Sequence, residues 1–416
     1  MIPGWSRMVR VFGRIGLLSF GGPAAQIALM HDALVEREKW LSEAQYLRAL
    51  SLCMLLPGPE AMQLATYAGW RLRGVTGGLL AGLLFVVPGA LVILALALAY
   101  VQFGTLPLVQ AAFLGIKAAV IVVVLQALLR LGRKALHGPM AWALAGAAFF
   151  ALFALGVPFP AIVISAGIVG YITARPGTGQ PVAAPARDAP PLWQTVATWA
   201  ALWATPLLVL WLTAQAFLLQ LGLFFSRLAV VTFGGAYAVL AYMTQTVVQD
   251  FGWITTGQMI DALGLAETTP GPLILVTEFV ALLAGFAQGG LALALAAGAV
   301  CLWVTFVPCF LWIFAAGPYV EQLAARPRLS GALGAITAAV VGVILNLSVW
   351  FALHVLFADI GTYGALPAPV WASLHLPALL LTAAALGLML GLRLSFGWTL
   401  PLMAALGVAL SLGGLA

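Results

Sequence analysis

The stretch LPGPE, Leu56 to Glu60, places two prolines and a glycine inside an apolar segment. Proline ends one helix and fits the first turn of the next, and glycine permits the unusual backbone angles between them. A second break, FGGP, runs from Phe20 to Pro23. A helix that begins inside a membrane exposes free N–H groups and the positive end of its dipole, and an anion satisfies both. The two motifs predict either simple kinks, repaired by neighbouring side chains, or broken helices that can bind an anion, and their recurrence later in the chain favours broken helices.

Composition indicates what surrounds these breaks. The 416 residues are 63% hydrophobic and 7% charged, which is too apolar for an ordinary water-soluble globule. Continuous apolar runs at 76–102, 106–129, 289–319 and 328–357 are each long enough to cross a hydrocarbon layer of about 30 Å. The strands of a β-barrel would alternate polar and apolar residues instead. The predicted fold class is an all-α polytopic membrane protein.

An internal repeat organises the chain. At an offset of 213 residues, Phe20, Gly21 and Gly22 fall on Phe233, Gly234 and Gly235, and Pro57, Gly58 and Pro59 fall on Pro270, Gly271 and Pro272. After an insertion the offset is 220 residues, which matches Gln126 with Asn346. One position departs from the repeat, since Ala236 stands where the first copy has Pro23.

The repeat also predicts the domain boundaries. The first repeat occupies 1–174 and the second repeat occupies 192–416. Between them, the stretch 175–191 is rich in Pro and Ala and has no apolar periodicity, as is typical of an exposed linker. We expect this linker on the cytoplasmic side.

Basic residues predict the orientation of the two copies, because Lys and Arg accumulate in short cytoplasmic loops. With spans counted from a first one at 8–30, the N-terminus, Arg71, Arg73 and the basic cluster at 130–134 lie on the cytoplasmic side. A seventh span at 192–220 then crosses alone, so the second copy starts on the opposite face. We expect about 13 transmembrane helices in two inverted repeats with broken helices, an arrangement typical of secondary transporters that bind their substrate near mid-membrane.

Polar side chains near the breaks complete the expected anion site. Arg14 and Arg227 occupy matching positions six residues before their Phe-Gly-Gly motifs. Lys117 lies deep in an apolar run, where a charge is expensive, so it either serves the anion or forms a salt bridge with a buried carboxylate. The expected substrate-binding residues are Arg14, Ser19, Gly21, Gly22, Pro57, Gly58, Pro59, Gln63, Lys117, Arg227, Thr232, Gly234, Gly235, Pro270, Gly271, Pro272, Thr337 and Asn346.

Three carboxylates, Glu60, Glu267 and Glu278, lie next to the PGP motifs on apolar segments. Burial raises the pKa of a carboxyl group, so that such a group can exchange protons near neutral pH. These residues either carry a coupling proton or neutralise the basic residues of the site. The sequence leaves both roles open.

Motifs of several other protein classes are absent from the sequence. It contains no Walker A loop, no GxGxxG motif after a strand and no HExxH motif, and its cysteines and histidines lack the spacing of metal ligands. We therefore expect neither an enzyme nor a cofactor or metal ion. The energy for transport would come from an ion gradient or from the substrate's own gradient.

Several long motifs occur in a familiar order. The first half carries FGGP and LPGPEAMQLATYAGW, and the second half carries FGGAYAVLAYM and ETTPGPLILVTEFV. These motifs resemble the chromate ion transporter (CHR) family in its long two-domain form, over roughly 10–130 and 222–357. The family motif positions present here are Gly21, Gly22, Pro23, Pro57, Gly58, Pro59, Glu60, Gln63, Gly234, Gly235, Glu267, Pro270, Gly271 and Pro272.

The resemblance implies export of chromate across the bacterial inner membrane, chromate resistance, and sulfate as a chemically similar competitor. The expected partners are chromate and the lipid bilayer, and no nucleic acid is expected. A homodimer is an open alternative to a monomer. Three alternatives stay open: a transporter of sulfate or another oxyanion, a passive anion channel with the same lining, and a scaffold or lipid-handling membrane protein. Proton flux coupled to chromate flux distinguishes an exporter from a channel.

Overall fold

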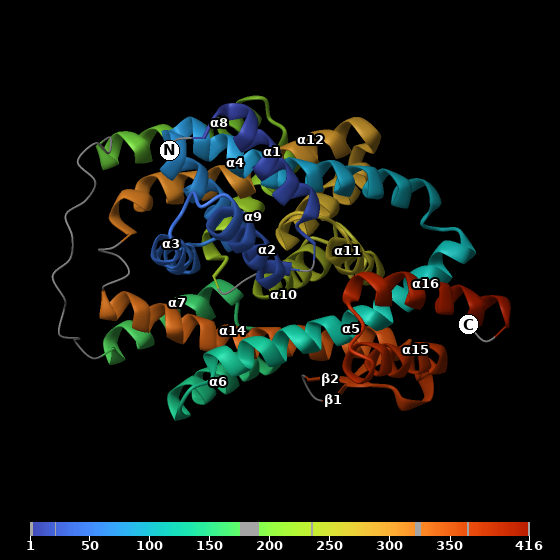
Figure 1. Cartoon of the computed structure of the whole chain (residues 1–416). Helices are drawn as coiled ribbons and strands as arrows, with labels where there is room; N and C mark the ends of the chain where they lie inside the picture. Colours follow the sequence, from blue (N-terminus) through green and yellow to red (C-terminus); the bar gives the residue numbers. More distant parts are fainter. Residues whose placement is uncertain are drawn as a thin grey trace. The chain divides into compact units, whose positions relative to one another are not determined.

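The computed structural model describes residues 3–20, 22–174, 191–233, 236–320, 326–363 and 366–414. This part of the chain is almost entirely helical, in agreement with the predicted fold class (Figure 1). Its only strands, β1 (Ile360–Tyr363) and β2 (Leu366–Pro369), pair antiparallel. Gly21, Gly234, Gly235 and all but the last residue of the predicted linker lie outside the described residues.

The same order of elements occurs twice in the described chain. The first half contains α1 (Trp5–Leu18), α2 (Gly22–His31), the π-helical turn η1 (Asp32–Arg37), α3 (Glu43–Leu55), α4 (Glu60–Phe103), α5 (Pro107–Ala135), α6 (Pro139–Leu155) and α7 (Phe159–Thr173). The second half contains α9 (Ala216–Val231), α10 (Ala236–Thr244), the π-helical turn η2 (Gln245–Asp250), α11 (Thr256–Thr268), η3 (Leu273–Leu275), α12 (Val276–Ala316), η4 (Gly317–Tyr319), α14 (Pro327–Leu356), η5 (Trp371–Ser373), α15 (Leu376–Leu386), η6 (Gly387–Gly391) and α16 (Phe396–Leu412). One helix, α8 (Leu192–Leu212), lies between the two sets.

Helix capping follows the repeat as well. At the start of α3, the Gln45 N–H donates to the Ser42 hydroxyl group and the Ser42 N–H donates to the Gln45 side chain. At the start of α11, Thr255 and Gln258 make the same two bonds. Such a capping box satisfies two of the orphan N–H groups of a helix N-terminus. The duplication has therefore preserved local hydrogen bonding together with the order of the helices.

Two of the longest helices are helical hairpins. The backbone of α4 leaves helical angles at Arg73 and Gly74, and that of α12 does so at Gly289 and Gly290 with nearly the same values. A Cβ atom added at Gly69 would collide with the carbonyl group of Gly77, although eight residues of straight helix extend about 12 Å. The chain therefore turns back, and the segments 60–72 and 75–103 pack against each other, close to the spans predicted there.

The number of membrane crossings stays a prediction. Five helical segments of the described chain are long and apolar enough to cross a membrane: Glu60–Phe103, Pro107–Ala135, Leu192–Leu212, Leu273–Tyr319 and Pro327–Leu356. The span expected at 8–30 is divided into α1 and α2, helices of 14 and 10 residues, as the FGGP break predicts, and whether the two together cross the membrane stays a prediction. Neither helix is long enough to cross about 30 Å of hydrocarbon.

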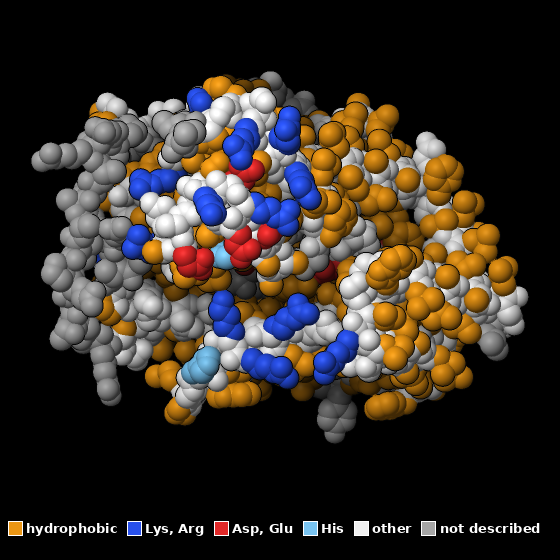
Figure 2. Space-filling view, viewed as in Figure 1, with side chains coloured by type: hydrophobic (Ala, Val, Ile, Leu, Met, Phe, Trp, Pro, Cys, Tyr) orange, Lys and Arg blue, Asp and Glu red, His pale blue; other side chains and the backbone are white. Residues whose placement is uncertain are grey.

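The surface agrees with a multi-pass membrane protein. Lys and Arg side chains gather over α1, α2 and α3, whereas hydrophobic side chains cover the surface of α16, where Trp398 and Leu412 are exposed (Figure 2). A water-soluble surface would not carry such large exposed apolar residues at this density. The apolar surface is therefore suited to lipid.

The chain divides into two compact units, and each contains segments from both halves of the sequence. The first unit comprises Met1–Ala95, Ile168–Val239 and Thr269–Leu333, and the second comprises Leu96–Gly167, Leu240–Thr268 and Gly334–Ala416. In the first unit, α12 packs against α8 and α9, and Trp199 of α8 stacks on Phe310 of α12. In the second unit, α15 and α16 pack against α5 through a core that includes Ala119, Leu381 and Met403 (Figure 1).

Candidate functional site

Two hydrogen bonds join the PGP break of each copy to the Phe-Gly-Gly break of the other copy. The Gly58 N–H donates to the Thr232 carbonyl group, and the Gly271 N–H donates to the Ser19 carbonyl group, both at 2.9 Å. All four residues belong to the first unit. We call these contacts the first crossing (Gly58 and Thr232) and the second crossing (Gly271 and Ser19). They are equivalent under the 213-residue offset, so each copy closes the break of the other.

Glycine is required at both crossings by backbone conformation. The φ angle is +119° at Gly58 and +89° at Gly271, a region that side-chain-bearing residues rarely adopt. Space is also short, because a Cβ atom at Gly58 would lie 2.8 Å from Gln63 Nε2 and 2.9 Å from Cys309 Sγ. The flanking prolines remove donors that the tight loop could not satisfy. Sequence and geometry therefore specify the same break in both copies.

Buried helix N-termini follow directly after the crossings. Helix α4 begins at Glu60, and the Gln63 N–H is bonded to the Pro59 carbonyl group at 3.1 Å. The N–H groups of Ala61 and Met62 have no acceptor inside the helix. Ala61 and Met62 are 2% and 0% exposed, so water has little access to them. Free donors and the positive end of the helix dipole meet here, which favours an anion.

Two glutamines of the first copy hold the crossings in place. The Gln26 side chain donates to the Gly271 carbonyl group at 2.7 Å and to the Ser19 carbonyl group at 3.2 Å. The Gln63 side chain donates to the Pro57 carbonyl group at 2.6 Å, and its Oε1 atom has no hydrogen-bond partner within the described residues. Both glutamines are buried. Each PGP loop is therefore fixed by an amide group from the first copy.

The hydroxyl groups of Ser19 and Thr232 donate hydrogen bonds within their own helices. Ser19 Oγ donates to the Ile15 carbonyl group at 2.5 Å, and Thr232 Oγ1 donates to the Leu228 carbonyl group at 2.6 Å. Their matched positions carry matched bonds, as the repeat predicts. These hydroxyl groups end the helices α1 and α9, and their backbone carbonyl groups form the crossings.

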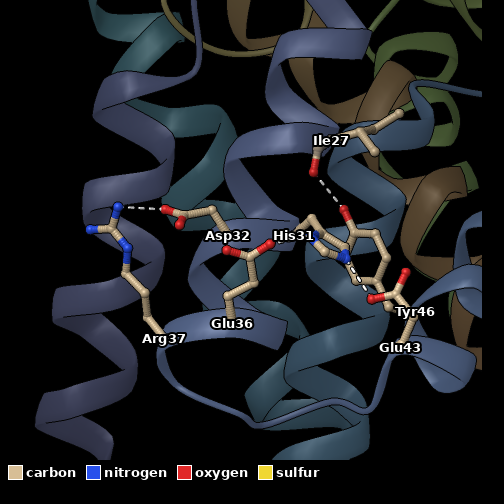
Figure 3. Close-up of polar contacts among 7 residues, drawn as sticks. All are labelled: Ile27, His31, Asp32, Glu36, Arg37, Glu43 and Tyr46. Atoms are coloured by element: carbon tan, nitrogen blue, oxygen red, sulfur yellow. Dashed lines mark hydrogen bonds and ion pairs between the residues drawn. The ribbon is translucent and has the colours of Figure 1, made fainter.

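A charged connector links α2, which begins at one break, to α3, which ends at the other. His31 lies 2.6 Å from a Glu43 carboxylate oxygen and 3.4 Å from a Glu36 oxygen, while Tyr46 donates to the Ile27 carbonyl group at 2.6 Å (Figure 3). The ring of His31 also contacts the edge of Tyr46. These contacts from η1 and α3 hold the end of α2 and so help to fix both breaks of the first copy.

Lys117 is paired with a carboxylate in the second unit. Its Nζ atom lies 3.1 Å from Oδ1 of Asp261, and the Tyr100 hydroxyl group donates to Oδ2 of Asp261 at 2.7 Å. Lys117, on α5, and Asp261, on α11, both line a cavity of about 290 Å³. Of the two roles that the sequence left open for Lys117, the salt bridge is the one present in the structure.

A second cavity of about 290 Å³ lies elsewhere in the second unit. Thr244, Gln245, Asn346 and His354 contribute its polar lining. Asn346 was expected in the anion site, and the structure places it at this cavity. Thr337, also on α14, is half-buried. The second unit therefore offers neutral hydrogen-bonding groups in one cavity and a charged pair in the other.

Comparison with known proteins identifies the family. A family model described as chromate transporter matches the chain twice, at residues 6–171 and 219–411. This chain belongs to the chromate transporter family. A chromate transport protein of Cupriavidus metallidurans is 33% identical over 343 residues, which cover 81% of this chain and 80% of that protein.

Two further relatives of this chromate transporter family member have similar names. A chromate transport protein of Pseudomonas aeruginosa is 34% identical over 80% of this chain and 77% of its own length. A probable chromate transport protein of Synechococcus elongatus is 32% identical over 81% of this chain and 82% of its own length. No solved structure is significantly similar to the chain.

Other residues expected at the anion site of this family member lie in varied surroundings. Arg14 and Arg227 are on the exposed faces of α1 and α9. Glu60 and Glu267 are half-buried, whereas Glu278 is 3% exposed and its Oε2 atom has no hydrogen-bond partner within the described residues. The roles of all five residues in transport stay predictions.

Sequence reasoning missed three side chains that the structure brings into the candidate sites: Gln26, Tyr100 and Asp261. Asp261 carried a signal, because it is a lone carboxylate in the apolar stretch MIDALGLA and corresponds to Arg48 in the first copy. Gln26 lies three residues after Pro23, but its match is Val239, so a search for matched polar residues passes over it. The partners of these side chains are distant in sequence, and only the fold identifies them.

Proposed function

We propose that this protein is a secondary active transporter that exports chromate from the cytoplasm across the bacterial inner membrane and thereby confers chromate resistance. The observation that carries the proposal is the pair of crossings, in which Gly58 and Gly271, just before buried helical segments, are bonded to the ends of α9 and α1. The proposed substrate comes from the names of the relatives, and the helix N-termini beside the crossings offer donors that can bind it.

The crossings suit a small oxyanion. A dianion such as chromate is stabilised by free N–H donors and helix dipoles in a site that excludes water. Backbone donors also tolerate the loss and regain of a ligand without leaving a buried charge unpaired. Sulfate has the same shape and charge, so it is the expected competitor, and a difference in affinity has to come from fine geometry.

The distribution of basic residues supports an inverted second copy. At the end of α5 stand Arg130, Arg133 and Lys134, whereas the matching positions on α14 are occupied by Trp350, Leu353 and His354. The start of α14 carries Arg326 and Arg328 where the first copy has Leu106 and Leu108. Since basic residues favour the cytoplasmic side, opposite ends of matching helices then face the cytoplasm. This supports inverted repeats with a cytoplasmic N-terminus, the plan on which alternating access is built.

Transport by the purified protein in proteoliposomes tests the proposal. We expect radiolabelled chromate to cross vesicles that contain the protein faster than protein-free vesicles, and unlabelled sulfate to compete. Gly58→Ala should abolish this flux, because it strains the first crossing. The matched control is Gly252→Ala, which also changes a glycine with a positive φ angle but has open space around it.

Four results would overturn the proposal or part of it. Vesicles with wild-type protein that move no chromate would exclude chromate transport, and movement of sulfate alone would assign another oxyanion. Equal loss of flux in Gly58→Ala and Gly252→Ala would mean that the first crossing is not part of the anion site. A flux that never concentrates chromate under any ion gradient would identify a passive channel.

A further inference from the structure

The pair formed by Lys117 and Asp261 is costly to bury. Asp261 is 6% exposed, and the side chain of Lys117 is 23% exposed. Removing two charges from water costs several kcal/mol per ion, so a buried pair of this kind rarely stabilises a protein better than apolar residues would. In a membrane protein, such charges mark ion and proton pathways by default.

The repeat shows that this pair is not required by the fold. Lys117 on α5 belongs to the first copy and Asp261 on α11 to the second. The matching positions carry Thr337 on α14 and Arg48 on α3, which have no opposite charges to pair with each other. Helices α3 and α11 have the same length, the same capping box and the same following PGP break. The matching helices α3 and α14 therefore form without such a pair, which argues against a purely structural role.

The cavity beside the pair gives the carboxyl group access to water. The polar residues of its lining include Gln110, Thr255 and Gln258 in addition to Tyr100, Lys117 and Asp261. A volume of about 290 Å³ is enough for several water molecules, and these groups can hydrogen-bond them. Protons can therefore reach Asp261 through this cavity.

Protonation of Asp261 and its ion pair with Lys117 exclude each other. The charged and titratable groups that face its carboxyl group are Lys117 of α5 and Tyr100 of α4. While Asp261 is ionised, Lys117 is bound to it. When Asp261 takes up a proton, the carboxyl group becomes neutral and the ammonium group of Lys117 is released toward the cavity. Two arrangements of one pair thus differ by a single proton.

We propose that Asp261 is the proton-binding residue of this transporter, that Lys117 is its positioning partner, and that the cavity between α4, α5 and α11 is the proton-binding site. The inference rests on the proposed transport function and adds a coupling ion and a residue to it. No covalent step is involved, because the proton binds to one carboxylate oxygen and later leaves it.

The test compares chromate accumulation with and without a pH gradient in proteoliposomes whose membrane potential is clamped to zero. With one proton coupled to each chromate, a gradient of about one pH unit changes the equilibrium accumulation about tenfold. We expect this response in the wild-type protein, together with a chromate-driven change in internal pH. Asp261→Asn should still equilibrate chromate but lose both the tenfold response and the pH change.

Matched variants separate proton binding from folding. Asp250→Asn removes an exposed carboxylate from η2 and should respond as the wild type does. Should Asp261→Asn fail to fold, the double variant Lys117→Met with Asp261→Asn removes both charges at once and should show the same loss of coupling. Tyr100→Phe keeps the ion pair but removes a donor to the ionised carboxylate, so it should retain coupling and move the midpoint of the pH profile upward.

Each outcome decides between the two proposals. A tenfold response in Asp261→Asn, or a Tyr100→Phe pH profile identical to that of the wild type, would overturn the role of Asp261 while chromate transport stands. A wild-type protein that moves chromate without any response to pH would do the same. A wild-type protein that moves no chromate would remove the proposed function and this inference together.

Discussion

Gly58 and Gly271 occupy matching positions and donate to matching carbonyl groups at the same distance, yet their surroundings differ. In the first copy, Gln26 and Gln63 bind the loop carbonyl groups. Their matches in the second copy, Val239 and Val276, are buried and apolar. Proline and glycine thus set the backbone of both crossings, whereas the amide groups come from one copy alone. A symmetric scaffold has therefore acquired asymmetric side chains.

The buried ion pair joins Lys117 of the first copy to Asp261 of the second, and the matching residues Thr337 and Arg48 have no opposite charges to pair with each other. Breaking this asymmetric pair should have the largest effect on stability. Lys117→Met leaves Asp261 buried without its cation, which should lower the free energy of unfolding by about 3 kcal/mol. Chemical unfolding in detergent measures this change. Arg130→Met, an exposed cation on the same helix, should change stability by less than about 0.5 kcal/mol.

Adding Asp261→Asn to Lys117→Met should restore most of the lost stability, because the unpaired charge is then removed. No recovery in the double variant would mean that the two side chains act independently. The pair would then not distinguish the two copies.

Gln26→Val makes the first copy resemble the second at one position. The change removes two hydrogen bonds to buried carbonyl groups, so we expect the free energy of unfolding to fall by about 2 kcal/mol. Gln102→Val, an exposed glutamine at the end of α4, is the matched control and should have little effect. Equal losses in the two variants would show that the Gln26 contacts contribute nothing specific to the second crossing.

Gln63→Val should have a smaller effect than Gln26→Val. The Gln63 side chain donates to the Pro57 carbonyl group at 2.6 Å, and its Oε1 atom has no hydrogen-bond partner within the described residues. Losing the bond while also removing a buried unsatisfied oxygen should cost about 1 kcal/mol. An unfolding midpoint that falls further than that of Gln26→Val would reverse the order proposed for the two glutamines.

The smallest effects are expected where the copies agree. Ser42→Ala and Thr255→Ala each remove the same side-chain bond from a capping box at the surface, and each should lower the free energy of unfolding by about 0.5 to 1 kcal/mol. The two losses should match within experimental error. A clear difference between them would show that equal local geometry does not give equal energy in the two copies.

Much of the fold could be predicted from the sequence, because its signals are local. Pro57, Gly58 and Pro59 specify a helix break by backbone chemistry alone, and apolar composition specifies the membrane. The duplication repeats these local signals in the second copy. The predicted apolar runs at 76–102 and 289–319 begin close to the turns at 73–74 and 289–290, although the turns themselves were not predicted.

The remaining features depend on contacts between distant residues. The FGGP motif predicts the break between α1 and α2, but it does not tell that the Ser19 carbonyl group at this break accepts from the Gly271 N–H. Nor does the sequence tell that Lys117 meets Asp261, 144 residues away, since that depends on how α5 packs against α11. Arg14 and Arg227 are exposed because of the helix faces on which they lie, and counting membrane spans does not distinguish one face of a helix from another.

The crossings also bear on how such a chain could arise. Each break is closed by a carbonyl group that only the other copy provides, so a single copy would expose an unpaired loop unless a second chain supplied the partner. A one-copy ancestor would then have worked as a pair of chains whose assembly depended on their concentration. Joining the two copies in one chain makes the closure intramolecular and independent of concentration. It also frees each copy to change separately, and the one-sided glutamines and the Lys117–Asp261 pair are the kind of difference that two identical subunits could never acquire.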